Sequence, residues 1–155
     1  MIIFAIDPGN EKSAFVLYDT EQKIIIDKRI LDNGLLLVYM RDVVYDELAI
    51  EMIASYGMPV GKTVFDTCLW VGRFVQAALP CKAHLIYRKD EKMFLCASMK
   101  AKDSNIRQAL IDLLGKETTK GCSKDIWAAL AVAITFYGTR NSFDRNVTEI
   151  KEIPF

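Results

Sequence analysis

Three carboxylates that lie far apart along the chain, those of Asp7, Glu51 and Asp125, are the side chains best suited to chemistry. Carboxylate oxygens are ligands that Mg²⁺ prefers, and the ion keeps several of its own waters. Two such ions about 3.5–4 Å apart can activate a water and stabilise the leaving oxygen when a phosphodiester is cut. The reaction to consider is therefore metal-assisted hydrolysis, provided that the fold gathers the three.

Asp7 stands where a predicted strand ends. The apolar run at residues 2–6 is typical of a buried strand, Pro-Gly follows Asp7, and a second apolar run at 14–17 predicts an antiparallel return strand. A carboxylate at the edge of a cleft on a rigid strand is well placed to bind a metal. The alternative is an ordinary turn residue, since Asp-Pro-Gly is common in turns.

Glu51 and Asp125 each have two interpretations as well. Glu51 interrupts a mostly apolar strand predicted at 47–53, where a carboxylate is costly unless it is paired, protonated or metal-bound. The alternative is that Glu51 lies on an edge strand of the sheet and faces solvent. Asp125 opens the last predicted helix, whose alanines favour a close approach to the sheet; its alternative is helix capping, because the helix dipole favours a negative charge there.

Hydrophobic patterning predicts the element order β-β-β-α-β-α-β-α-α in a single domain over residues 1–155. The predicted strands cover 2–6, 14–17, 23–30, 47–53 and 83–87, and the predicted helices cover 35–43, 63–79, 105–114 and the stretch from 125 onward. A short helical turn is expected at 93–97, with Asp103 and Ser104 capping the helix that follows. Residues 139–155 are expected to form a polar, frayed tail.

Composition and charge narrow the protein class. With 52% hydrophobic and 26% charged residues, the 155-residue chain is long enough for one real core. No apolar run reaches the roughly 18 residues of a membrane span, and the four cysteines lack metal-ligand spacing, so we expect a cytoplasmic protein without a membrane. Net charge is zero, but residues 82–124 hold 10 basic and 5 acidic residues. This net +5 segment suits phosphate binding, or else a solvated helix face.

Three motifs together resemble the RuvC-type Holliday-junction resolvases of the RNase H-like (retroviral integrase) superfamily, above all the short enzymes encoded by bacteriophages. They are AIDPGN at 5–10, AIEMIASYGMPVGK at 49–62 and DIWAALAVAIT at 125–135. The resemblance implies an RNase H-like α/β fold. Its mixed five-stranded sheet would combine an antiparallel meander with parallel strands and carry helices on both faces.

The resemblance also implies a function, a Mg²⁺-dependent endonuclease that cleaves Holliday junctions and other branched DNA. Asp7 would bridge two ions, with Mn²⁺ as a substitute for Mg²⁺, and Glu51 and Asp125 would each hold one. The family's further carboxylate, three residues after Asp125, is here Ala128. The second ion is therefore expected to bind weakly or through water.

The family's phosphate and junction contacts are matched less closely. Of its two lysines near the scissile phosphate, one falls close to Lys92, which we place with the catalytic residues, and the other aligns with Asp103, beside Lys102. In that family, an aromatic side chain in the loop after the glutamate pushes into the junction as a wedge. The matching position here is Ala54, so we assign the wedge role to Tyr56 instead. The expected nucleic-acid contacts are Tyr56, Lys89, Lys100, Lys102 and Arg107.

Two further points stay open at the level of sequence. The broad apolar face of helix 63–79 predicts a homodimer, as the resemblance also implies, whereas nothing points to a particular helicase partner. The alternative functions are an RNase H-like nuclease acting on RNA–DNA hybrids and a junction-binding protein with weakened catalysis. Retention of three acidic positions argues against the last, because phosphate binding alone would favour their loss.

Overall fold

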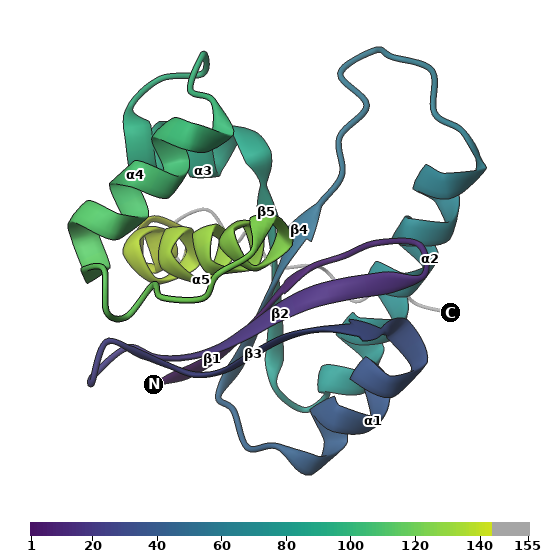
Figure 1. Ribbon diagram of the computed structural model, residues 1–155. Coiled ribbons are helices and arrows are strands. Elements are labelled where there is room, and N and C mark those ends of the chain that lie inside the picture. Colours follow the sequence, from purple (N-terminus) through teal and green to yellow (C-terminus); the bar gives the residue numbers. More distant parts are fainter. Residues whose placement is uncertain (144–155) are drawn as a thin grey trace.

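Five strands form one mixed sheet in a computed structural model that describes residues 1–143. The strands are β1 (Ile2–Asp7), β2 (Lys12–Asp19), β3 (Ile24–Asp32), β4 (Glu47–Met52) and β5 (Lys82–Tyr87). The helices are α1 (Asn33–Asp42), α2 (Lys62–Ala78), α3 (Arg88–Cys96), α4 (Asp103–Leu114) and α5 (Lys124–Phe143) (Figure 1). No helix of this described part is long and apolar enough to cross a membrane.

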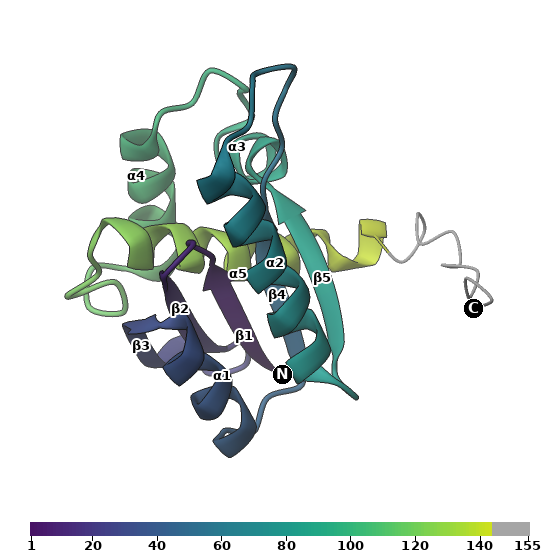
Figure 2. The same ribbon diagram turned by 90° about the vertical axis from the view of Figure 1, so that its right-hand side faces the viewer.

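The sheet order is β3-β2-β1-β4-β5, with antiparallel pairs along the β1–β2–β3 meander and parallel pairs from β1 to β4 and from β4 to β5. Helices α1 and α2 cover one face and α5 crosses the other, with α3 and α4 beside it (Figures 1 and 2). The predicted α/β fold class, a meander followed by parallel strands between helical layers, is confirmed.

Alternation along the central strand β1 divides the core into two clusters. Ile3 and Ala5 pack with α4 and α5, whereas Phe4 and Ile6 pack with α1 and α2. Because side chains alternate between the faces of a strand, Asp7 lies on the face that α5 covers. Small residues of α5, such as the fully buried Ala129, let this helix approach the sheet closely, as predicted.

The structure corrects the sequence prediction in the region between β5 and α5. Residues 88–96 form a full helix, α3, where only a short turn at 93–97 was expected, because its polar start hides the apolar spacing. Helix α4 begins at Asp103 with Lys102 as its N-cap residue, so Asp103 and Ser104 are not the caps. Asn105 provides the cap instead, since its Oδ1 accepts a hydrogen bond of 2.9 Å from the Lys102 N–H.

Helix α5 continues through residues 139–143, the start of the predicted tail. The remainder of that prediction, residues 144–155, lies outside the described residues.

Candidate active site

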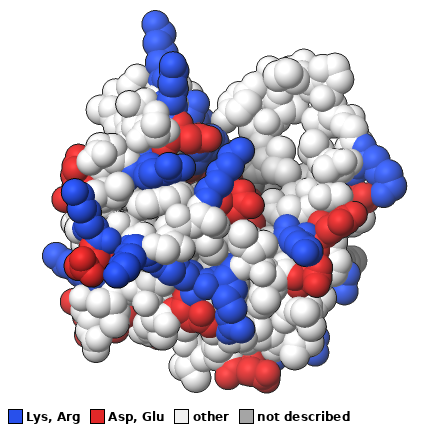
Figure 3. All heavy atoms as spheres, in the orientation of Figure 1, with Lys and Arg blue, Asp and Glu red and all other residues white. Residues whose placement is uncertain are grey.

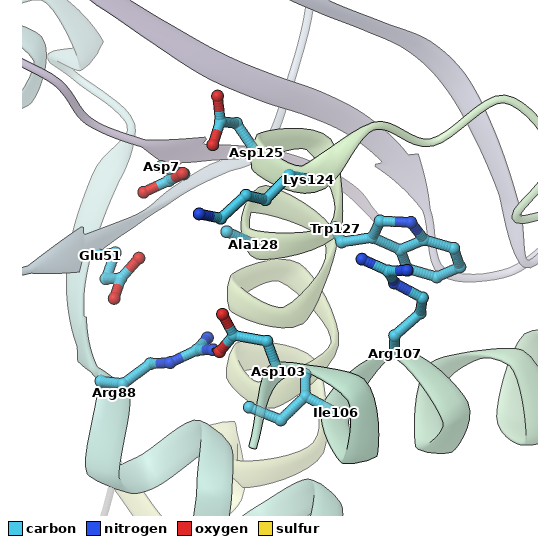
Figure 4. Close-up of a pocket in the computed structure, with 10 residues that line it drawn as sticks. All are labelled: Asp7, Glu51, Arg88, Asp103, Ile106, Arg107, Lys124, Asp125, Trp127 and Ala128. Atoms are coloured by element: carbon cyan, nitrogen blue, oxygen red, sulfur yellow. The ribbon is translucent and has the colours of Figure 1, made fainter.

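The three predicted carboxylates line one pocket. Parallel pairing of β1 with β4 ends at Ile6 and Ile50, so the next residues, Asp7 and Glu51, are neighbours on the face that α5 covers. Helix α5 begins at the same end of the sheet and brings Asp125 close to Asp7 (Figure 4). The complete lining is Asp7, Glu51, Arg88, Asp103, Ile106, Arg107, Lys124, Asp125, Trp127 and Ala128.

A small buried hydrogen-bond network fixes the turn that follows Asp7. Ser13 Oγ accepts a hydrogen bond of 3.1 Å from the Gly9 N–H and donates one of 2.6 Å to Asn33 Oδ1. Asn33 Nδ2 donates in turn to the Gly9 carbonyl at 2.9 Å. Because Ser13 and Asn33 are buried, these bonds do not compete with water and they hold the end of β1 in place.

Gly9 is required in this turn for lack of space. A Cβ there would lie 2.2 Å from the Lys12 carbonyl oxygen, so Gly9→Ala forces the backbone apart. We expect this variant to lose about 1–3 kcal/mol of unfolding free energy, measured by urea denaturation. Gly34→Ala in α1 is the matched control: no atom lies within 4 Å of its Cβ, and alanine in a helix gains up to about 1 kcal/mol. Equal stabilities of the two variants would contradict the argument.

Electrostatic repulsion is concentrated at Asp7. Burial, then the charge of Glu51 and a hydrogen bond with it, and then the charge of Asp125 raise the pKa of Asp7 to about 8, and Arg88 opposes them only in part. A carboxyl group in this position keeps its proton near neutral pH unless a cation replaces it. The local field therefore favours a positive ion beside Asp7.

Arg88 and Glu91, in the first turn of α3, were not predicted as site residues. Arg88 lines the pocket and forms two ion pairs, one with Glu91 within α3 and one with Asp103 that joins α3 to α4. Burial and then the charge of Glu51 raise the pKa of the fully buried Glu91 to about 8. In sequence, Glu91 belongs to a charged run that is typical of a solvated face. Glu91 lies four residues before the half-buried Leu95, so the two side chains share one face of a helix. This spacing indicates an inward position for Glu91 only once the helix is known to begin at Arg88.

The donor set suits a hard divalent cation, although no group of three or more His, Cys, Asp or Glu side chains among residues 1–143 already converges as a metal-ligand cluster. Asp7 and Glu51 offer oxygen atoms, the ligands that Mg²⁺ takes, and their mutual repulsion has only partial compensation from Arg88. Ala128, at the position of the family's further carboxylate, does line the pocket but offers no ligand.

The predicted basic residues are distributed more widely. Arg107 lines the pocket, with its guanidinium 5.6 Å from the centre of the Trp127 ring. Lys92 does not line it; its ammonium lies 3.5 Å from the Met99 carbonyl oxygen. Lys89, Lys100 and Lys102 lie around α3 and α4, where Figure 3 shows basic side chains along one side of the hollow.

Tyr56 lies in the loop between β4 and α2, on the other side of the hollow. Its side chain is 66% exposed and its backbone adopts φ +48°, a left-handed conformation that is uncommon outside glycine. Residues 53–61 carry no charge, and this side is white in Figure 3. Tyr56 is thus free to contact a ligand, but it is not part of the carboxylate pocket.

Comparison with solved structures identifies similar folds, although no protein-family model matches the sequence and no curated protein is detectably similar to it. The RuvC structure from Thermus thermophilus aligns with a TM-score of 0.78 at 16% identity, over 92% of this chain and 97% of that one. T. thermophilus RuvC in complex with a Holliday junction substrate aligns with 0.75 at 15% identity, over 92% and 96%. The fowlpox virus Holliday junction resolvase gives 0.50 at 15% identity, over 90% and 99%. The chain thus shares the RuvC fold, and the resemblance predicted from the three motifs is confirmed at the level of fold.

Proposed function

We propose that this protein is a divalent-metal-dependent endonuclease that cleaves Holliday junctions and related branched DNA. The observation that carries the proposal is the meeting of Asp7, Glu51 and Asp125 at one end of the sheet. The RuvC fold supports it, since one of the similar structures holds a Holliday junction substrate. Three acidic side chains in a pocket would repel DNA phosphates, so their presence favours cleavage over binding alone.

The residues of the pocket divide between two tasks. Asp7, Glu51 and Asp125 would hold Mg²⁺, which supplies an activated water and stabilises the charge that develops on the leaving oxygen. Arg107 and Lys124 line the same pocket and would orient the scissile phosphate.

A cleavage panel tests this proposal. A four-way junction, a fork, a flap, an RNA–DNA hybrid and a linear duplex would be incubated with Mg²⁺, with Mn²⁺ and with EDTA. We expect cleavage of the branched DNAs with either metal and none in EDTA. Preference for the hybrid would favour the RNase H-like alternative, and tight junction binding without cleavage under any condition would favour the binding protein.

We further propose a homodimer through the outer face of α2, which would suit symmetrical cleavage of two strands. Phe65 and Leu69, one turn apart on this helix, are 59% and 69% exposed, and Leu79 just after it is 63% exposed. Apolar side chains grouped in this way favour burial against a partner.

The dimer is tested by Leu69→Glu, which places a charge in the proposed contact. We expect wild-type protein to sediment as a dimer at micromolar concentration and Leu69→Glu as a monomer. Val44→Glu, at another highly exposed apolar side chain outside α2, is the control and should remain a dimer. A monomeric wild type, with and without DNA, would contradict the proposal.

The basic side chains near α4 are proposed to bind DNA phosphates. Removal of one such side chain should flatten the log–log salt dependence of junction affinity by about one unit. We expect this for Lys100→Ala, Lys102→Ala and Arg107→Ala, and for Arg107→Ala slower cleavage as well, because Arg107 lines the pocket. Lys82→Ala, at the opposite end of β5, is the control. Unchanged slopes in all variants would place the DNA on another face.

A further inference from the structure

Glu91 is a buried carboxylate with one oxygen that has no partner. Its side chain is 0% exposed, and its Oε2 accepts a hydrogen bond from Arg88. Its other oxygen, Oε1, has no hydrogen-bond partner among the described residues. A buried carboxylate oxygen without a donor or cation is costly, so its retention requires a compensating interaction.

The position of α3 places Glu91 next to the carboxylate pocket. The β4–β5 pairing ends with Met52 opposite Tyr87, and α3 begins at the next residue, Arg88. The first turn of α3 therefore stands at the end of the sheet where Glu51 lies. Arg88 lines the pocket and its guanidinium donates a hydrogen bond to Glu91 Oε2, so Glu91 lies directly behind Arg88, although it is not itself one of the lining residues.

We propose that Glu91 is a further carboxylate of the divalent-cation site that Asp7 and Glu51 form, with its free oxygen Oε1 as the atom that acts on the cation. This inference rests on the proposed function. It assigns a role in cation binding to a residue of α3, outside the three motifs of the sequence and beside a pocket in which Ala128 contributes no oxygen.

A simpler role for Glu91 would be to anchor Arg88, and the two roles predict different effects on cation affinity. If Glu91 acts on the cation, loss of its charge weakens binding, whereas loss of Arg88 removes a competing positive charge and does not weaken it. If Glu91 only positions Arg88, the two losses have the same effect on cation affinity.

The experiment measures Mn²⁺ binding to the DNA-free protein by titration calorimetry and by the electron paramagnetic resonance signal of free Mn²⁺. We expect Glu91→Gln to weaken Mn²⁺ affinity about tenfold or more and Arg88→Met to leave it unchanged or stronger. Asp90→Asn is the matched control. The Asp90 carboxylate accepts a hydrogen bond of 3.3 Å from the Tyr87 N–H, so this substitution should not change the Mn²⁺ affinity. Wild-type affinity in Glu91→Gln, or equal weakening in Arg88→Met, would overturn the inference.

A double variant, Arg88→Met with Glu91→Leu, covers the case in which Glu91→Gln fails to fold. An apolar pair leaves no buried charge unpaired, and such replacements are often neutral for stability. We expect the double variant to bind Mn²⁺ about tenfold more weakly than Arg88→Met alone, and an affinity equal to that of Arg88→Met would overturn the inference. If Asp7→Asn abolishes Mn²⁺ binding while both Glu91 variants retain it, only the role of Glu91 fails. If wild-type protein binds no Mn²⁺, the proposed metal-dependent function fails with it.

Discussion

Asp7→Asn is expected to lower cleavage of a four-way junction by about a thousandfold or more while junction affinity stays the same or increases. The amide keeps the size of the side chain but removes the charge that, in the proposed function, would hold a divalent cation. Binding can increase because a negative charge close to DNA phosphates is removed. Single-turnover cleavage and electrophoretic mobility of the bound junction give the two quantities separately.

Two comparisons make this result specific. Glu51→Gln and Asp125→Asn should show the same separation of cleavage from binding, because both side chains line the pocket with Asp7. Asp112→Asn removes an exposed carboxylate from α4, where it accepts a 2.8 Å hydrogen bond from Gln108, and should cleave like wild type. A pocket variant with near wild-type turnover would remove that residue from the site, and an equal loss of binding would indicate a structural role.

The ends of two strands and the start of a helix explain why these three residues could be predicted as candidates from the sequence. Asp7 and Glu51 each interrupt an apolar run, and parallel pairing of two buried strands then makes them neighbours. Asp125 opens an alanine-rich helix that can lie directly against such a sheet. In each case a short stretch of sequence determines the local structure, whereas the sheet order that brings the three together was implied by the resemblance to the RuvC-type resolvases and not by these stretches.

Glu91 and Lys92 show what could not be predicted from the sequence. A charged helix that buries one of its charged residues can have the same composition as a helix that buries none. The sequence around Glu91 therefore does not indicate that Glu91 is buried. Its burial depends on the packing of α3 against α4 and α5, in which Arg88 pairs with Glu91 and Asp103. The adjacent Lys92 points instead toward the Met99 carbonyl. Which member of a charged helix is buried is thus a result of tertiary packing.

Stability is also expected to depend on pH through Asp7, with a sign that follows from its environment. Burial, then repulsion from Glu51, raises the pKa of Asp7 from 3.8 to about 8 in the folded protein. Between these values the folded state holds a proton that the unfolded state has released, so rising pH favours unfolding. The full contribution of Asp7 is present below the unfolded pKa and is lost as pH rises through the folded one.

The measurement is the midpoint of thermal unfolding, Tm, in EDTA from about pH 5 to about pH 8, for wild type and Asp7→Asn. Since the amide does not titrate, the difference between the wild-type and variant Tm reports the titration of Asp7 together with its effect on the groups that interact with it, Glu51, Glu91, Asp125 and Arg88. We expect wild type to lose several degrees relative to the variant as pH rises, and Mg²⁺ at the upper pH to restore them by neutralising the repulsion. A difference that is constant over this range, or that grows in favour of wild type, would show that the Asp7 carboxyl is already ionised without a cation.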